Sequence, residues 1–211
     1  MSAHGVAGVV QGLAVTVFGV LVGLLLGGDV GAIVGGVLLG LFALPYGKAV
    51  TEGQMYASDA LGIWRFFLDA TWSVPNTAAG ALYYGVHRMT GNTHDLAKTH
   101  HSGAIWLVRG VVPRYATTIG AVKAGSNERI DDHEMIHVFQ ARLFGPVYLI
   151  GVGLNYVIAT ILPYWLLFKH RRKITGFGSY FEDGVYPNVW NELWAYKVAR
   201  RRPRAMGMLE T

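Results

Sequence analysis

Residues 6–26 read VAGVVQGLAVTVFGVLVGLLL, and this uncharged stretch decides the class of the protein. An α-helix of about 20 apolar residues is long enough to cross the hydrocarbon core of a bilayer. The stretch lacks the basic segment and the cleavage site of a removable signal peptide. Gly27-Gly28-Asp29 predicts a turn, and residues 30–45 form a second apolar run. We therefore predict that residues 1–47 form a glycine-rich transmembrane helical hairpin.

The glycines of this region recur at four-residue intervals, at positions 19, 23, 27, 31 and 35, and again at 36 and 40. Small residues at this spacing let two helix backbones approach closely within lipid. Two uses remain open from the sequence. The glycines pack the two limbs of one hairpin together, or they mediate self-association with a second membrane protein.

The composition of the whole chain agrees with a membrane protein. Apolar residues make up 52% of the 211 residues and charged residues only 15%, whereas about 25% is usual in soluble domains. The chain has no cysteine, so disulfides and cysteine-ligated zinc are excluded. Residues 169–211 carry nine Lys or Arg against four Asp or Glu, which predicts a cytoplasmic C-terminus. We expect no nucleic-acid partner, because no recognition motif accompanies the basic tail.

His133-Glu134-Met135-Ile136-His137 is the stretch that indicates chemistry. Residues four apart share a helix face, so His133 and His137 can bind one Zn²⁺. Glu134 then lies beside the metal, where it can accept a proton from zinc-bound water. Gln140 follows on the same face, and the sequence Gly145-Pro146 predicts where the helix ends.

A zinc site needs a third protein ligand, and the best candidate is Glu192, 55 residues beyond His137. Here the chain resembles the gluzincin class of zincin metallopeptidases, which place HExxH on one helix and a Glu on a later one, often within Asn-Glu. The resemblance covers His133, Glu134, His137 and the pair Asn191-Glu192. It departs where those enzymes commonly have an Asp after the Glu, since Ala195 and Tyr196 stand there. Support for the histidines is then expected from Asp132 or Gln140.

A wider stretch, roughly residues 70–196, resembles a group of uncharacterised bacterial membrane proteins. The matching motifs are Trp72-Ser73-x-Pro75-Asn76-Thr77, Thr117-Thr118-Ile119-Gly120, and HExxHxxQ followed by Leu143-Phe144-Gly145-Pro146-x-Tyr148. This resemblance implies a location in the bacterial inner (cell) membrane, with the lipid bilayer and other membrane proteins as partners. It implies the layout of the metal site more than any activity.

The middle of the chain predicts the rest of a membrane-associated, zincin-like domain over residues 48–211. Residues 60–72 predict an interfacial helix with an ion pair between Arg65 and Asp69, four residues apart. Residues 105–112 and 116–123 are rich in β-branched side chains and predict two short strands. The predicted fold class is therefore a membrane α+β protein, with the N-terminal hairpin, a small sheet, the HExxH helix and a third apolar segment.

That third segment, residues 145–168, constrains the metal site. If it crosses the bilayer, His137 and Glu192 lie on opposite sides and cannot share a metal. Asn155 interrupts the run near its middle. We therefore predict a re-entrant hairpin of two half-length segments, residues 147–152 and 157–168, with a transmembrane helix as the alternative.

The function predicted from these features is zinc-dependent hydrolysis of peptide bonds near the membrane. His133, His137 and Glu192 hold the metal and Glu134 is the catalytic base, with Tyr180, Tyr186 or His170 as candidate donors to the oxyanion. The alternative is a non-catalytic membrane subunit or scaffold with a structural or vestigial metal site. A third reading is a helix whose histidines bond only to neighbouring side chains. His94, His100 and His101 are expected to be solvated loop histidines.

Overall fold

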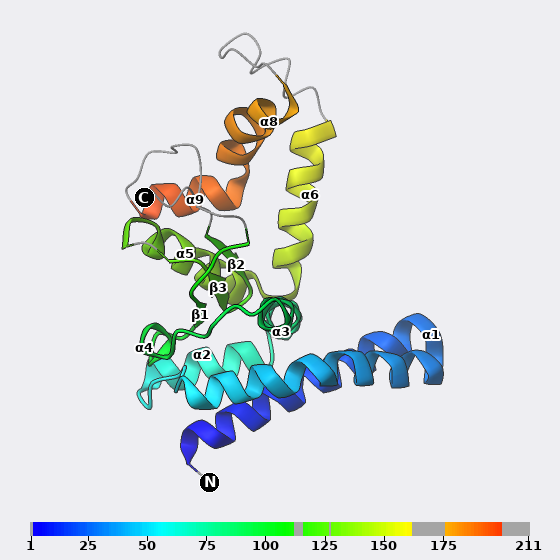
Figure 1. Cartoon of the computed structure of the whole chain (residues 1–211). Coiled ribbons are helices and arrows are strands. Elements are labelled where there is room, and N and C mark those ends of the chain that lie inside the picture. The colour runs from blue at the N-terminus through cyan, green and yellow to red at the C-terminus, as the bar shows by residue number, and fades with distance from the viewer. Residues whose placement is uncertain (1, 112–115, 127, 162–175, 200–211) are drawn as a thin grey trace.

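The structure is a computed structural model, and it describes residues 2–111, 116–126, 128–161 and 176–199. The fold is α+β and mostly helical, with one small three-stranded sheet (Figure 1). The long N-terminal helical element projects from a body that contains the sheet and the remaining helices. The predicted α+β class and the predicted small sheet are confirmed.

The N-terminal element α1 (Ala3–Glu52) is a hairpin of two helices. The backbone leaves helical geometry at Gly27 and Gly28, and Gly28 has a φ of +58°, which favours glycine. The limbs touch backbone to backbone: a Cβ on Gly23 would lie 2.0 Å from the carbonyl oxygen of Gly31. Glycine is therefore required in the seam between the limbs, as the intramolecular alternative predicted.

Two helices cover the base of the hairpin: α2 (Ala60–Ala70) and α3 (Val74–Met89). The predicted pair between Arg65 and Asp69 is wrong. Asp69 turns into the interior, where Arg142 donates to both of its carboxylate oxygens at 2.9 and 2.6 Å. Arg65 instead donates to the carbonyl of Ser102. A buried carboxylate needs a buried cation close by, and that requirement overrides the helical spacing.

The sheet consists of β1 (Ile105–Leu107), β2 (Thr117–Ile119) and β3 (Val122–Ala124), in the order β1-β3-β2. β1 and β3 are parallel, and β2 pairs antiparallel to β3. The predicted strand over residues 116–123 is therefore two strands joined at Gly120, whose φ is +58°. The short helix α4 (Leu96–Thr99) precedes the sheet. The main core combines hairpin, α3 and sheet residues, including Val15, Tyr46, Tyr84, Ile105 and Val122.

The helix α5 (Glu128–Phe144) carries the HEMIH stretch and ends where Gly145-Pro146 predicted. A 3₁₀ turn, η1 (Gly145–Val147), links it to α6 (Tyr148–Ile161), and Gly145 has a φ of +52° beside the Trp72 ring. The helix α6 continues through Asn155, so the predicted break at this residue is wrong. Most of the predicted second half-segment, residues 162–168, lies outside the described residues.

The chain returns to the body through α8 (Phe177–Tyr180), the π-helical turn η2 (Phe181–Val185), the 3₁₀ turn η3 (Tyr186–Asn188) and α9 (Trp190–Val198). This return places α9 beside α5 (Figure 1). By length and composition, two described helical segments could cross a membrane: Ala3–Glu52, and Ile130–Ile158, which bends at η1.

Candidate metal centre

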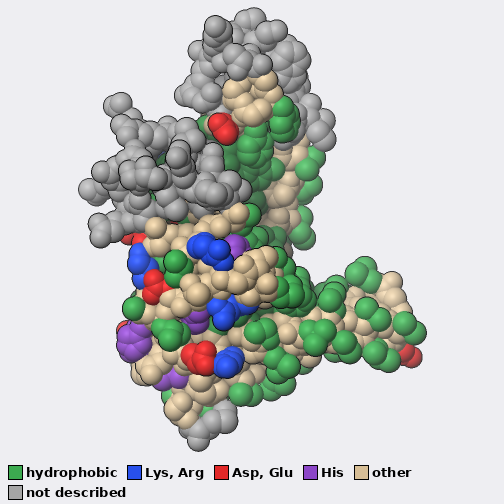
Figure 2. Space-filling view, in the orientation of Figure 1, with side chains coloured by type: hydrophobic (Ala, Val, Ile, Leu, Met, Phe, Trp, Pro, Cys, Tyr) green, Lys and Arg blue, Asp and Glu red, His purple; other side chains and the backbone are tan. Residues whose placement is uncertain are grey.

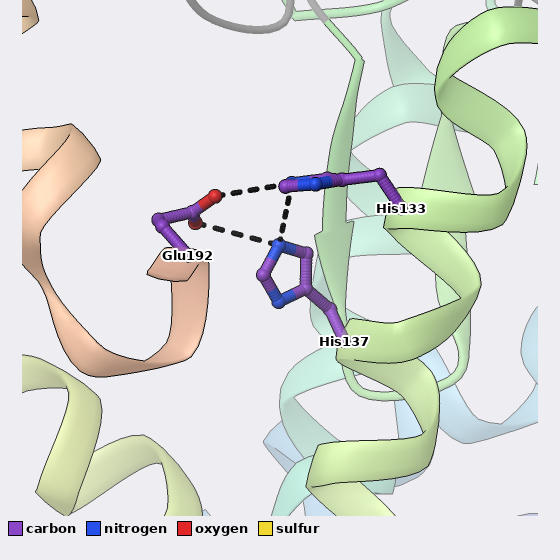
Figure 3. A group of neighbouring side chains, drawn as sticks. All are labelled: His133, His137 and Glu192. Carbon is purple, nitrogen blue, oxygen red and sulfur yellow. Dashed lines mark hydrogen bonds and ion pairs between the residues drawn. The ribbon is translucent and has the colours of Figure 1, made fainter. Parts of the chain in front are cut away.

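Three potential ligands converge between α5 and α9. The Nε2 atoms of His133 and His137 lie 3.1 Å apart. Glu192 presents one carboxylate oxygen to each imidazole, Oε2 at 3.1 Å from Nε2 of His133 and Oε1 at 3.4 Å from Nε2 of His137 (Figure 3). All three side chains are buried. The structure thus brings together the three residues that the sequence predicted as metal ligands.

The spacing of these atoms suits a tetrahedral ion. Ligand atoms about 2.0–2.1 Å from a tetrahedral Zn²⁺ lie about 3.3 Å from one another. The two imidazole nitrogens lie 3.1 Å apart, close to that edge length. Each nitrogen also faces a different oxygen of Glu192, at 3.1 and 3.4 Å, so the carboxylate is placed to complete the group. Two imidazoles and a carboxylate are also the ligand set of one class of catalytic zinc sites. The group fits a metal ion, and imidazole nitrogens also accept copper, nickel or iron.

Each helix contributes its ligands through local geometry. His133 and His137 are one turn apart on α5, so their rings lie on one face. Glu192 lies in the first turn of α9, where the positive end of the helix dipole stabilises a carboxylate. That position suits an anionic ligand.

Gln140 sets the orientation of the second imidazole. Its Nε2 donates to the carbonyl of Asn191 at 2.9 Å, which leaves Oε1 as an acceptor. Oε1 lies 2.9 Å from Nδ1 of His137 and also accepts the Tyr148 hydroxyl at 3.1 Å. The proton of neutral His137 is therefore on Nδ1, and the Nε2 lone pair faces the other ligands. The support predicted from Asp132 or Gln140 comes from Gln140, since Asp132 is exposed.

The first imidazole is held by packing. Among the described residues, Nδ1 of His133 is buried with no hydrogen-bond partner. The Tyr196 ring lies 4.3 Å from the His133 ring, centroid to centroid. Tyr196 occupies the region where gluzincins commonly carry an Asp. Its spacing of four residues from Glu192 was a signal that it shares the same face of α9.

Glu134 lies beside the group without being one of the three converging ligands. Its Oε2 accepts the hydroxyl proton of Thr118 at 2.5 Å, from the edge strand β2. This bond fixes one carboxylate oxygen of Glu134. Thr118 was not predicted to have a role, although it lies within the Thr117–Gly120 motif. Contact between β2 and α5 could not be read from the spacing of the motif alone.

The charges of the ligands are coupled. Burial disfavours a charged His137, but the Glu192 carboxylate outweighs this and raises the pKa of His137 to about 9. Burial also disfavours a charged Glu192, and the facing His137 imidazolium outweighs it, lowering the pKa of Glu192 to about 2. Without a metal the pair is ionic at neutral pH. A divalent cation would replace the proton on His137.

The other residues considered from the sequence lie elsewhere or outside the described residues. Tyr180 belongs to a second apolar cluster with Val185 and Val189. Tyr186 lies in η3, just before α9, and burial and then the Glu192 charge raise its pKa. His170 is outside the described residues. His100 and His101 are exposed, and His94 bonds to Thr99.

Comparison with known proteins adds no further identification. No family profile, curated protein or solved structure matches the chain. The likeness to an HExxH site therefore rests on the sequence His133-Glu134-Met135-Ile136-His137 and on its convergence with Glu192. The geometry shows a buried His-His-Glu group that could hold a metal ion.

Proposed function

We propose that the protein is a membrane-associated, metal-dependent hydrolase of the zincin type, acting on peptide bonds close to the lipid surface. The convergence of His133, His137 and Glu192 carries this proposal. Their side chains come from two helices, with Glu192 55 residues beyond His137, and leave the fourth tetrahedral position for water or substrate. Zinc is the ion that best suits this ligand set.

The residues around the ligands support a hydrolytic mechanism. A bound zinc ion would polarise a water molecule and the scissile carbonyl. Glu134 would accept a proton from that water and later deliver it to the leaving amine. Thr118 holds one oxygen of Glu134, which limits the rotation of the carboxylate. Gln140 keeps the proton of His137 on Nδ1, away from the reacting atoms.

The hairpin supports a membrane location. Hydrophobic side chains cover its projecting arm (Figure 2). The glycines in the seam let the two limbs pack directly against each other, so the hairpin needs no second protein to cover that face. Burying such a surface in lipid avoids the cost of exposing a large apolar patch to water. The bacterial inner membrane, with the basic tail in the cytoplasm, remains the proposed location.

The test is metal content and cleavage by the purified full-length protein in detergent. We expect about one zinc per chain in the unmodified protein, and loss of zinc in His133→Ala. Glu134→Gln should retain zinc and lose cleavage of unstructured peptide substrates by about 100-fold or more. Retained zinc in His133→Ala would contradict the ligand assignment. Unchanged cleavage in Glu134→Gln would contradict the mechanism.

A second candidate is a non-catalytic membrane subunit whose metal is structural. The burial of the centre favours it, since His133, Glu134, His137 and Glu192 are each at most 7% exposed. Such a site would bind zinc, and the Glu134→Gln protein would behave like the unmodified one in every assay. Complete absence of cleavage with one zinc bound would favour this function over the hydrolase.

A further inference from the structure

The outer face of α6 carries a continuous apolar stripe. Val147, just before the helix, and Ile150, Leu154, Val157 and Ile158 are 47–65% exposed. They recur at intervals of three or four residues, so they lie on one side of the helix. The helix contains no charged residue. An exposed face of this kind in an otherwise packed body requires an apolar environment.

The opposite face of α6 is polar and belongs to the metal centre. The hydroxyl of Tyr148 donates to Gln140, the residue that orients His137. Oδ1 of Asn155 accepts the backbone N–H of Trp190, at the start of the helix that carries Glu192. One side of α6 therefore carries exposed apolar side chains, and the other side makes hydrogen bonds to the rest of the protein. Such a helix can contact lipid on one side only, while its other side stays packed on the protein.

The hairpin α1 has the pattern of an inserted element instead. Large apolar side chains are exposed along both limbs, among them Val17, Leu21 and Leu25 on the first and Val30, Val34 and Val37 on the second. An element that is apolar on its exposed sides is suited to the hydrocarbon core. The hairpin is thus exposed along the outer sides of both limbs, whereas α6 is exposed along one side only.

Their directions also differ. The helix α6 runs across the direction of the hairpin (Figure 1), so one flat bilayer cannot be crossed by both. Hydrophobic side chains line the edge of the α6 region on the side towards which the hairpin arm projects (Figure 2).

We propose that α6 lies flat in the bilayer interface, with its apolar stripe at the boundary between headgroups and acyl chains, while the hairpin enters the hydrocarbon core. This inference rests on the proposed membrane insertion of the hairpin. It places the metal centre directly above the lipid headgroups, because the inner face of α6 bonds to Gln140 and α9. The site would then accept peptide segments that emerge from the bilayer.

The absence of native cysteine makes a depth measurement direct. The full-length protein would carry one cysteine at a time, Ile150→Cys, Leu154→Cys or Val157→Cys, labelled with the fluorophore NBD. Each protein is reconstituted into phosphatidylcholine and phosphatidylglycerol vesicles that contain nitroxide lipids with shallow or deep quenchers. Leu21→Cys and Leu25→Cys report on the hairpin, and exposed Ala97 of α4, as Ala97→Cys, is the aqueous control. A circular dichroism spectrum and a size-exclusion profile like those of the unmodified protein show that each variant is folded.

We expect the three α6 labels to be blue-shifted, quenched more by shallow than by deep nitroxides, and equal in depth. A helix that crosses the bilayer would instead separate positions 150 and 157 by about 10 Å in depth, and that gradient would overturn the inference. Labels on α6 that no lipid quencher reaches would also overturn it, since water or a protein would then cover the face. If the Leu21 and Leu25 labels stay outside lipid, the membrane part of the proposed function fails as well, while zinc binding and cleavage test its chemistry separately.

Discussion

At the scale of single residues, the metal centre depends on how protons are distributed around His137. The side-chain amide of Gln140 has a fixed orientation because its Nε2 donates to the carbonyl of Asn191. Its oxygen must then accept from Nδ1 of His137. One glutamine thus determines which imidazole nitrogen can bind a metal. This control requires the packing of α5 against α9, so only the helical spacing of Gln140 pointed to it in the sequence.

Replacing Gln140 tests this role. Gln140→Met retains a similar volume and removes the acceptor, so His137 is free to adopt either tautomer. Loss of such an outer hydrogen bond typically lowers metal affinity by about 10- to 100-fold. We expect this loss in a competition titration with a zinc indicator. Gln140→Glu restores an acceptor and should recover much of the zinc affinity. An unchanged zinc affinity in Gln140→Met would show that Gln140 does not orient His137.

The His137–Glu192 pair also predicts how stability depends on pH in the metal-free protein. The pKa of folded His137 is raised to about 9, above the value of about 6.5 for an unfolded histidine. Its contribution to stability is therefore complete below about pH 6.5 and disappears as the pH rises to about 9, with a magnitude on the order of 3 kcal/mol. Thermal unfolding in detergent should show Tm falling over this range.

Two comparisons check the origin of that decline. Glu192→Gln removes the carboxylate that raises the pKa of His137, so the decline in Tm should be much smaller. Zinc-loaded protein should not show it, because its histidines are already neutral ligands. A decline of equal size in Glu192→Gln would assign the pH dependence to another group.

At the scale of elements, the return of α9 to α5 was the hardest feature to predict. The sequence indicated the HEMIH helix, its end at Gly145-Pro146 and the glycine turn of the hairpin, because each depends on neighbouring residues. It gave the wrong partner for Asp69 and merged β2 with β3, because those features depend on distant parts of the chain. Asn155 shows the reason most clearly. A polar residue in an apolar run suggested a break, whereas its side chain accepts a hydrogen bond from the first turn of α9.

Asn155 therefore acts as a cap supplied by another helix. The Trp190 N–H is one of the amides that a helix N-terminus leaves unpaired, and α9 has no side-chain cap of its own. Asn155→Ala should cost about 1 kcal/mol in unfolding free energy and weaken zinc binding, because α9 carries Glu192. The neighbouring Gly153→Ala is the matched control, since its added methyl meets nothing within 4 Å. It should leave zinc affinity unchanged; equal weakening in both variants would argue against a capping role.

At the scale of the whole molecule, a buried ion pair joins α2, at the base of the hairpin, to α5, which carries the two histidines. Arg142 on α5 bonds to Asp69 on α2, and Tyr56 also donates to Asp69 at 2.9 Å. The Arg142 and Asp69 side chains are 7% and 2% exposed. Removing one partner leaves the other charge buried without compensation. The pair therefore connects the position of α5, which carries His133 and His137, to the base of the hairpin.

A double-mutant cycle measures this connection. Asp69→Leu or Arg142→Met alone should each cost about 3–5 kcal/mol, while the double variant should cost less than either single one. Lys48→Ala is a matched control in a surface pair with Glu52, where the Lys48 side chain is 73% exposed, and it should change stability by less than about 1 kcal/mol. Additive losses in the double variant would show that Asp69 and Arg142 contribute independently.

The glycine seam of the hairpin has a mechanical consequence. Because the two backbones touch at Gly23 and Gly31, the limbs cannot slide past one another without steric clash. They therefore move as one rigid hairpin. In a bilayer that is too thin for it, a rigid hairpin adapts by tilting as a unit. The body at its base would rotate with it and change the height of the zinc ligands above the phosphates. Under the proposed function, acyl-chain length would then change the rate of cleavage without any lipid contacting the three ligands.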